Sequence, residues 1–227
     1  MPVSVLIADV GAVAGVRALT RKPKPARHPG LLHAEVALAK PLGGGRVPKV
    51  QPGRVCLLTY WEEGADIDGF EATDPLARSL AGGFHARLDP LRRFGTWPGI
   101  PDDLTVRRSV DHEGCAVVIT LARTKFSQLP RFLPISAGVE QGALAADGLL
   151  WGTAMATPPF IATCTVWEST EALSAYAYGA KDAVHPLAMV EDRRKPFHHQ
   201  AAFVRFRPTA IGGRLAGRNP LTSDLAG

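Results

Sequence analysis

The sequence predicts an α+β protein of two similar halves, each ordered as strand, helix, strand, strand, helix, strand. Three observations support this fold class: short motifs recur at a fixed spacing, each copy alternates β-rich runs with helix-forming segments, and apolar residues suffice for a core. Hydrophobic residues make up 46% of the 227 residues and charged residues 21%, which is typical of a folded protein. The length allows one compact unit or two fused halves.

The motifs recur at two spacings. Glycine and proline motifs lie 118 positions apart: residues 30–32 match 148–150, 86–90 match 204–208, and Gly95 and Gly99 match Gly213 and Gly217. Between them, residues 56–62 resemble 162–168, so Trp61 and Trp167 correspond at a spacing of 106. Matched motifs at a long fixed period indicate a duplicated supersecondary unit.

The change of spacing places 12 extra residues before Trp61 in the first copy and 12 after Trp167 in the second. The first insertion is the glycine-rich stretch 43–53, and the second falls within 176–202 and contains His185. A duplicated scaffold with one elaborated copy suggests that the elaborated copy has the site. Simple divergence of a loop explains the insertion equally well.

Runs of β-forming residues predict four strands in each copy. They are 3–8, 31–38, 55–61 and 86–88 in the first copy and 116–122, 149–156, 161–167 and 203–206 in the second. With their helices, these strands give the βαββαβ order of a ferredoxin-like unit. We expect one half at residues 1–101, a linker at 102–113 and the other half at 114–227. Their two sheets pair face to face or edge to edge and enclose a pocket.

Helix signals in the second copy follow its third strand. Ser169 is a side-chain cap ahead of strong helix formers, and Gly179 is expected to end that helix. A second helical piece is expected to begin near Asp182 or His185 and to run to about Arg194. The elaborated segment is therefore predicted to be helical.

Several classes of protein are excluded. The start of the chain lacks a positive leader, and no apolar run approaches the roughly 18 residues of a membrane span. Cys56, Cys115 and Cys164 show no zinc or disulfide spacing, so we expect a soluble protein of a reducing, cytoplasmic compartment. The net charge is +5 and the run 21–28 is basic, but its prolines and its lack of aromatic residues argue against nucleic-acid binding. Neither a dinucleotide fingerprint nor a Gly-x-Ser-x-Gly elbow is present.

Several motifs, taken together, resemble one known family. They are residues 30–32 with the 43–45 glycines, 57–61, 95–99, 121–123, 129–132, 162–167, 175–178 leading to His185, 203–206 and 217–221. In this order the sequence resembles the spheroidene monooxygenase family of carotenoid-oxidising proteins, which belongs with the dimeric α+β barrel folds. The resemblance covers nearly the whole chain and is weakest at 11–29 and 102–113. The chain departs from the family at 195–199, where an aromatic pair is usual, and at Leu215, where a tryptophan is usual.

The resemblance implies a monooxygenase. Oxygenating an unactivated carbon needs a means of activating dioxygen that ordinary side chains lack. Haem held by one histidine is compatible with the resemblance, and His185 matches the family's histidine on the second-copy helix, so it is the expected iron ligand. His198 and His199 are alternative ligands, and the Cys164 thiolate is a weaker one. The expected partners are a small apolar or secondary-metabolite substrate, an unidentified electron donor and, through free edge strands, a second copy of the chain.

Two arginines and five further residues complete the expected site. Arg123 and Arg193 are expected to pair with a haem propionate or to stabilise bound oxygen. Solvent or nearby carboxylates, those of Glu191 and Asp192, are their alternative partners. The residues expected to contact the substrate are Thr165, Trp167, Phe132, Tyr178 and Met155.

Two other interpretations stay open. Alternation along 161–167 sends Thr165 and Trp167 to one face of their strand, and Trp167 is then either a ligand platform or a plug in the core. The alternatives to a haem-dependent monooxygenase are a non-enzymatic protein that binds haem or another small molecule, and a cofactor-free enzyme of the same fold.

Overall fold

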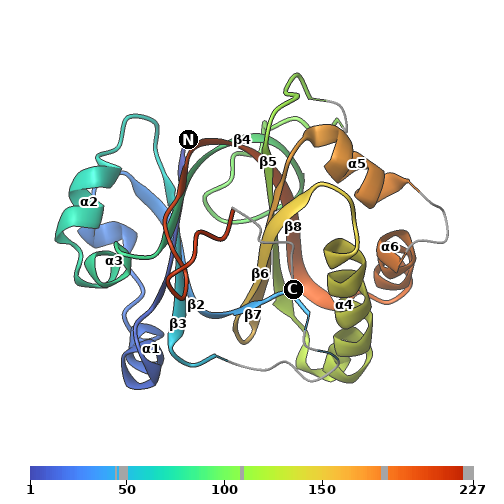
Figure 1. Ribbon diagram of the computed structural model, residues 1–227, viewed down its shortest axis with the longest axis horizontal. Coiled ribbons are helices and arrows are strands. Elements are labelled where there is room, and N and C mark those ends of the chain that lie inside the picture. Colours follow the sequence, from blue (N-terminus) through green and yellow to red (C-terminus); the bar gives the residue numbers. More distant parts are fainter. Residues whose placement is uncertain (44, 46–50, 108–109, 180–183, 222–227) are drawn as a thin grey trace.

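The computed structural model describes residues 1–43, 45, 51–107, 110–179 and 184–221, except for the side chains of 184–187 and 189. Eight strands form one closed barrel, with helices on two opposite sides (Figure 1). Within the described ranges, no helix is both long enough and apolar enough to cross a membrane.

The first half has the predicted element order. Its elements are β1 (Val3–Asp9), α1 (Ala12–Ala18), η1 (Pro25–Arg27), β2 (Leu31–Pro41), β3 (Arg54–Trp61), α2 (Ile67–Thr73), α3 (Pro75–Leu80) and β4 (Phe84–Gly95). The side chain of Asp66 accepts a hydrogen bond of 2.8 Å from the amide of Gly69, and Asp74 caps α3 in the same way. These caps satisfy amides that a helix start leaves unpaired.

The second half repeats this order. Its elements are β5 (Ala116–Thr124), η2 (Phe126–Gln128), α4 (Leu129–Leu144), β6 (Leu149–Thr157), β7 (Phe160–Trp167), α5 (Thr170–Tyr178), α6 (Val184–Arg194) and β8 (His198–Gly212). The predicted cap is present, because the Ser169 hydroxyl accepts a hydrogen bond of 3.2 Å from the amide of Ala172. Gly179 follows α5, and α6 ends at Arg194, as predicted.

The two halves join edge to edge. The strand order is β4-β1-β3-β2 in the first half and β8-β5-β7-β6 in the second, and the sheets meet where β2 pairs with β6 and β4 pairs with β8. The prediction of two fused ferredoxin-like halves is confirmed. Each strand of the described barrel therefore has two neighbours. The free edges from which a homodimer was expected are used within the chain.

The strands β4 and β8 are much longer than the sequence predicted. β4 covers Phe84–Gly95 and β8 covers His198–Gly212, and they pair with each other along their length. The register shifts near Pro90, where the sequence indicated the end of a strand. A bulge accommodates a residue that cannot donate to the ladder, so the strand continues past the proline.

The barrel interior is filled by the protein's own side chains. Inward-facing residues of the strands form one cluster of buried apolar side chains, among them Ile7, Phe84, Ile119, Val204 and Phe206, each fully inaccessible to solvent. Eight-stranded barrels are normally filled in this way. The expectation that the two sheets enclose a pocket between them is therefore wrong for the barrel interior. Any sizeable ligand binds outside it.

Helices α1, α2 and α3 seal the outer face of the first-half sheet (Figure 1). Val55, Leu57 and Trp61 of β3 are 0–1% exposed on this face, and Leu80 of α3 packs against them at 0%. Sheet and helices thus form a second continuous core. Burial of this kind contributes roughly 25 cal/mol per Å² of apolar surface.

Two glycines show the duplication in the backbone. Gly95 is the last residue of β4 and has φ 82°, and Gly213, its counterpart 118 residues later, has φ 94°. A Cβ at Gly95 would lie 2.1 Å from the carbonyl oxygen of Ala201, and one at Gly213 would lie 2.1 Å from that of Gly83. Both positions therefore require glycine for its left-handed backbone and for the close approach of the neighbouring strand.

We expect Gly95→Ala to lower the free energy of unfolding by about 2–4 kcal/mol, because the added methyl group meets backbone and the left-handed conformation is strained. The matched control is Gly64→Ala, where φ is 76° and nothing lies within 4 Å of the added Cβ. That variant should lose only about 1 kcal/mol. Urea unfolding of the two variants measures the difference, and equal losses would contradict the close approach.

Candidate functional site: the second-half layer

The outer face of the second-half sheet is incompletely covered, although α4, α5 and α6 lie on that side of the barrel (Figure 1). We call the region between this face and these helices the second-half layer. The residues on the sheet side of the layer that are only half-buried are Val118, Thr120, Ile161, Thr163, Thr165 and Phe203. Five of their six equivalents on the first-half sheet are nearly inaccessible, namely Ser4, Leu6, Val55, Leu57 and Thr59, and the sixth, His85, is exposed. The two halves of one fold therefore differ in how tightly their helices pack.

The helices of the second half are attached at a few points. In α4 only Ala143 is fully buried, although the helix has sixteen residues. The Arg131 guanidinium of α4 donates hydrogen bonds to the backbone and the carboxylate of Glu191 in α6. The hydroxyl of Tyr176 in α5 donates to the carbonyl of Val139 in α4 at 3.1 Å. These contacts join the helices to one another and leave the apolar sheet face beneath them partly open.

Two nearly buried arginines lie side by side at one end of this face. Arg92 of β4 and Arg205 of β8 are direct cross-strand partners, 8% and 6% exposed. Arg92 donates hydrogen bonds to the Tyr178 hydroxyl at 3.4 Å and to the carbonyl of Val106 at 3.2 Å. Burial lowers the pKa of Arg205, and the charge of Arg92 lowers it further. Among the described residues, neither guanidinium forms a salt bridge with a carboxylate.

His198 lies at the opposite end of β8, beneath α4 and α6. Its ring makes an edge contact with Phe132 at 5.2 Å between centroids, and its Nδ1 is 3.6 Å from a carboxylate oxygen of Asp192. Its Nε2 is buried and has no hydrogen-bond partner. Burial lowers the pKa of His198, against a smaller opposing effect of Asp192. The imidazole therefore stays neutral near pH 7 with one unpaired nitrogen.

The expected ligand His185 belongs to the first turn of α6, but its side chain lies outside the described residues. Arg193 is in the last turn of the same helix and is exposed. Both therefore belong to the helix that borders the second-half layer.

Arg123 lies elsewhere. It occupies an inward-facing position of β5, donates a 3.0 Å hydrogen bond to Glu35 and places its guanidinium 4.9 Å from the ring centre of Trp97. Glu35 is 5% exposed and also accepts hydrogen bonds of 2.9 Å from Lys22 and His33. The structure thus assigns Arg123 to a polar cluster at one mouth of the barrel. It does not bring Arg123 to the other expected site residues.

The five expected substrate contacts are also divided. Met155 is 3% exposed and points into the filled barrel, so it does not reach the second-half layer. Trp167 is 1% exposed, stacks on Tyr176 at 5.0 Å and donates from its indole nitrogen to Thr165. Trp167 is therefore a plug in the core, the alternative that the sequence left open. Thr165, Phe132 and Tyr178 lie on or beside the layer.

The cysteine alternative is unfavourable. Cys164 is 1% exposed inside the barrel, and burial raises the pKa of its thiol to about 12. A thiolate there is unstable, and no solvent-accessible face of the site adjoins it. Within the described residues there is also no group of three or more side chains that could hold a metal ion by themselves.

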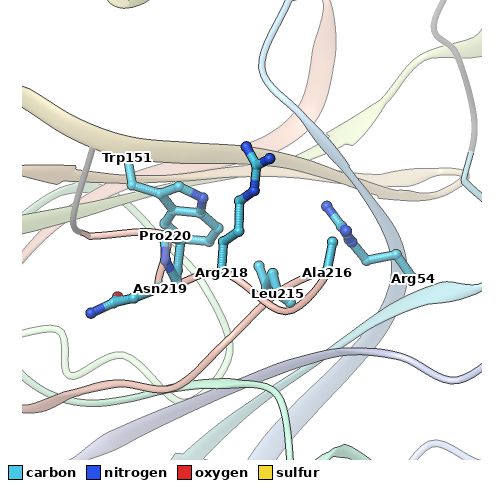
Figure 2. Close-up of a pocket in the computed structure, with 7 residues that line it drawn as sticks. All are labelled: Arg54, Trp151, Leu215, Ala216, Arg218, Asn219 and Pro220. Atoms are coloured by element: carbon cyan, nitrogen blue, oxygen red, sulfur yellow. The ribbon is translucent and has the colours of Figure 1, made fainter. Parts of the chain in front are cut away.

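A separate cavity of about 430 Å³ opens at the other mouth of the barrel (Figure 2). In Figure 2, Trp151 of β6 lies on one side and Arg54 on the other, and the Arg218 side chain of the C-terminal segment extends between them. Arg54 at its rim is held by two 2.8 Å hydrogen bonds to Asp9. This cavity is wide open and contains none of the residues expected from the sequence.

Sequence reasoning missed the arginine pair and the Glu35 cluster. The spacing of 118 matches Arg205 with Arg87, and by itself this match indicates only the duplication. The signal that could have found the pair is the environment of the two arginines: Glu71 of α2 forms an ion pair with Arg87, whereas the matching residue of α5 beside Arg205 is Ser174. Arg92 becomes its neighbour only through the pairing of β4 with β8.

The fold and the open layer define this protein as an α+β barrel of the dimeric type, in which one chain supplies both halves. The chain is 30% identical to the spheroidene monooxygenase of Rubrivivax gelatinosus over 201 residues, which covers 84% of this chain and 75% of that protein. The chain belongs to the spheroidene monooxygenase family. No family model matches it.

Solved structures show more distant likeness. A candidate monooxygenase from Fusobacterium nucleatum shares 10% identity with a TM-score of 0.43, and the match covers 96% of each chain. A heme-degrading enzyme from Listeria monocytogenes shares 12% identity with a TM-score of 0.31, covering 90% of this chain and 99% of the other.

Proposed function

We propose that this protein is a haem-dependent monooxygenase that oxidises an apolar or secondary-metabolite substrate in the second-half layer. The observation that carries the proposal is the contrast between the two halves: Val55 and Leu57 of the first-half sheet are 0–1% exposed, whereas the equivalent Ile161 and Thr163 of the second-half sheet are half-buried. Exposed apolar surface of this kind commonly marks a binding site. Membership of the spheroidene monooxygenase family supports oxidation of an apolar molecule there.

The residues around the layer fit haem. The apolar side chains of the face suit the macrocycle, and the neighbouring guanidiniums of Arg92 and Arg205, which form no ion pair among the described residues, suit its propionates. A neutral histidine is the required kind of axial ligand, and His185 is the proposed one because α6 borders the layer. Arg193, in the last turn of the same helix, is proposed to pair with a haem propionate. When bound, haem supplies the activation of dioxygen that side chains lack.

The chain's own contribution is to bind and orient the substrate and to exclude water. Val118, Ile161 and Phe203 offer apolar contacts, and Thr165 and Tyr178 offer hydroxyl groups at the edge of the layer. An apolar substrate held against this surface displaces water from around the reacting atoms. Exclusion of water strengthens every polar interaction in the site.

His198 is the alternative ligand, and its location makes a different prediction. Seven strand positions separate His198 from Arg205, which corresponds to roughly 23 Å along β8 at about 3.3 Å per residue. One haem does not easily span a bond to His198 and contacts with the arginine pair. Helix α6 runs back from its first turn toward Asp192, which contacts His198. His185 lies in the first turn of this helix, seven residues before Asp192.

Titration with haemin tests the proposal. We expect the wild-type protein to develop a sharp Soret band and His185→Ala to lose most of it, while His198→Ala keeps it. Far-UV circular dichroism shows whether each variant is folded. Loss of the band in His198→Ala alone would transfer the ligand role to that residue. A folded wild-type protein that leaves the haemin spectrum unchanged would reject haem dependence and favour a cofactor-free enzyme or a binding protein.

A further inference from the structure

The duplication provides an internal comparison for the arginine pair. Arg87 of the first half and Arg205 of the second half are counterparts at the spacing of 118. Both lie on the outer face of their sheet, and their neighbours in β1 and β5 are Ser4 and Val118. The two halves therefore present the same strand position in two different environments.

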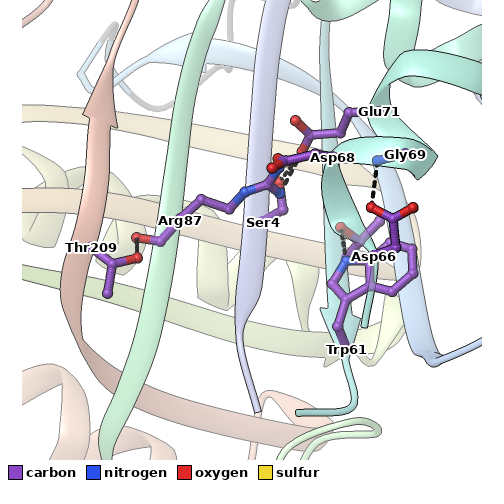
Figure 3. A network of polar contacts seen from close by, with 9 residues as sticks. Ser4, Trp61, Asp66, Asp68, Gly69, Glu71, Arg87 and Thr209 are labelled. Atoms are coloured by element: carbon purple, nitrogen blue, oxygen red, sulfur yellow. Dashed lines mark hydrogen bonds and ion pairs between the residues drawn. The ribbon is translucent and has the colours of Figure 1, made fainter. Parts of the chain in front are cut away.

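The first half neutralises its arginine (Figure 3). The Arg87 guanidinium donates to Glu71 at 2.8 Å and to Asp68 at 2.7 Å, both on α2. Ser4 donates to the same Glu71 carboxylate at 2.6 Å. The cross-strand partner of Arg87 is Ala210. The positive charge is thus fully paired within the chain.

The second half does not pair its arginine in this way. Aligned on their capping residues, Asp66 and Ser169, the two helices are related by a spacing of 103, so Asp68 and Glu71 correspond to Glu171 and Ser174. The position of Ser4 is taken by Val118, as the strand pairings show. Ala210 lies opposite Arg87, whereas Arg92 lies opposite Arg205. A second cation therefore takes the place of an alanine. The acid of Asp68 is kept as Glu171, but among the described residues Glu171 forms no ion pair with Arg205, and a like charge is added.

Such an arrangement is costly without an anion. Like charges directly opposite each other on neighbouring strands destabilise a sheet, and burial strengthens their repulsion. The charge of Glu171 raises the pKa of Arg205, but the two side chains form no ion pair in the described part of the chain. The Glu171 carboxylate is fully exposed and is hydrogen-bonded at the start of its own helix. Guanidiniums on adjacent strand positions supply the kind of donors that bind a carboxylate or phosphate.

We propose that Arg92 and Arg205 form a binding site for the anionic group of an amphiphilic ligand whose apolar body lies along the second-half layer. The site rests on the proposed function in so far as the same ligand occupies the layer. The ligand class is therefore an apolar molecule with at least one carboxylate or comparable oxyanion at its end. The hydroxyl of Tyr178, which accepts from Arg92, borders the same position.

The first test uses inorganic sulfate as the simplest oxyanion. Thermal unfolding is compared in sodium sulfate and sodium chloride at equal ionic strength for the wild type, Arg205→Met and Arg87→Met. Arg205→Met should fold and equal or exceed the wild-type melting temperature in chloride, because it removes a repulsion, while Arg87→Met should melt earlier. Sulfate should raise the melting temperature of the wild type and of Arg87→Met by several degrees more than that of Arg205→Met. An equal sulfate increment in all three proteins overturns the site.

The second test uses iron-free protoporphyrin IX and its dimethyl ester, with binding followed by quenching of tryptophan fluorescence. The free acid should bind Arg205→Met roughly tenfold to hundredfold more weakly than the wild type, whereas the ester should bind both equally. Ser174→Glu, which restores the counterpart of Glu71, should weaken the binding of the free acid in the same way. Equal binding of acid and ester to the wild type overturns the anion site and leaves the layer as a ligand site. If neither porphyrin binds but the sulfate increment is lost in Arg205→Met, the anion site holds and the haem proposal fails.

Discussion

Replacing Trp61 by alanine should destabilise the protein considerably more than replacing Trp167, its counterpart in the second half. Both indoles are 1% exposed, and each donates a hydrogen bond to a threonine two residues earlier. Trp61, however, packs into the continuous core of the first half, with the Phe70 ring 4.8 Å away. Its neighbours cannot collapse into the space it leaves. We expect a loss of about 4–5 kcal/mol for Trp61→Ala.

Trp167 has fewer fully buried neighbours, namely Ala116 and Leu173. Half-buried residues around it are able to move toward the vacated space, so we expect Trp167→Ala to lose only about 2–3 kcal/mol. Urea unfolding of both variants gives the comparison, with Trp61→Phe and Trp167→Phe as milder matched controls. Equal losses at the two positions would show that the second-half helices pack as tightly as those of the first half.

Replacing Glu35 by glutamine should have the second large effect. Its carboxylate is 5% exposed and accepts hydrogen bonds from Lys22, His33 and Arg123. Glutamine keeps the shape and removes the charge, which leaves three donors around a neutral amide. The Lys22 and Arg123 side chains are 42% and 32% exposed, so water relieves part of the cost. We expect a loss of about 2–3 kcal/mol at pH 7.

The same carboxylate predicts a pH dependence. Burial raises the pKa of Glu35, but hydrogen bonds from His33 and Lys22 and their positive charges outweigh burial, so its pKa lies below the ordinary value. Its contribution to stability is therefore complete above the ordinary pKa and is lost as the pH falls through the lowered one. Glu35→Gln should flatten this acid-side loss of stability. Exposed Glu62 is the control, since Glu62→Gln should leave the profile unchanged.

The recognition of a ligand site depended on comparing the halves. Local patterns located the strand of Trp167 and the cap at Ser169, and both are where the sequence placed them. They did not show which face of a strand is sealed. Met155 and Thr165 looked equally suitable as contacts, yet Met155 points into the filled barrel and Thr165 toward the open layer. Only the pairing and closure of the sheets separate these two residues.

The sequence by itself determined the duplicated βαββαβ order, the caps that begin and end α5, and the membership of the family, because these follow from local spacing of residues along the chain. The tertiary structure decided how the strands of the two halves pair and what their side chains contact. Closure of the barrel filled its interior, extended β4 and β8 past their prolines and brought Arg92 beside Arg205 from 113 positions away. Contacts between residues so distant along the chain arise from strand register, which depends on packing of the whole sheet.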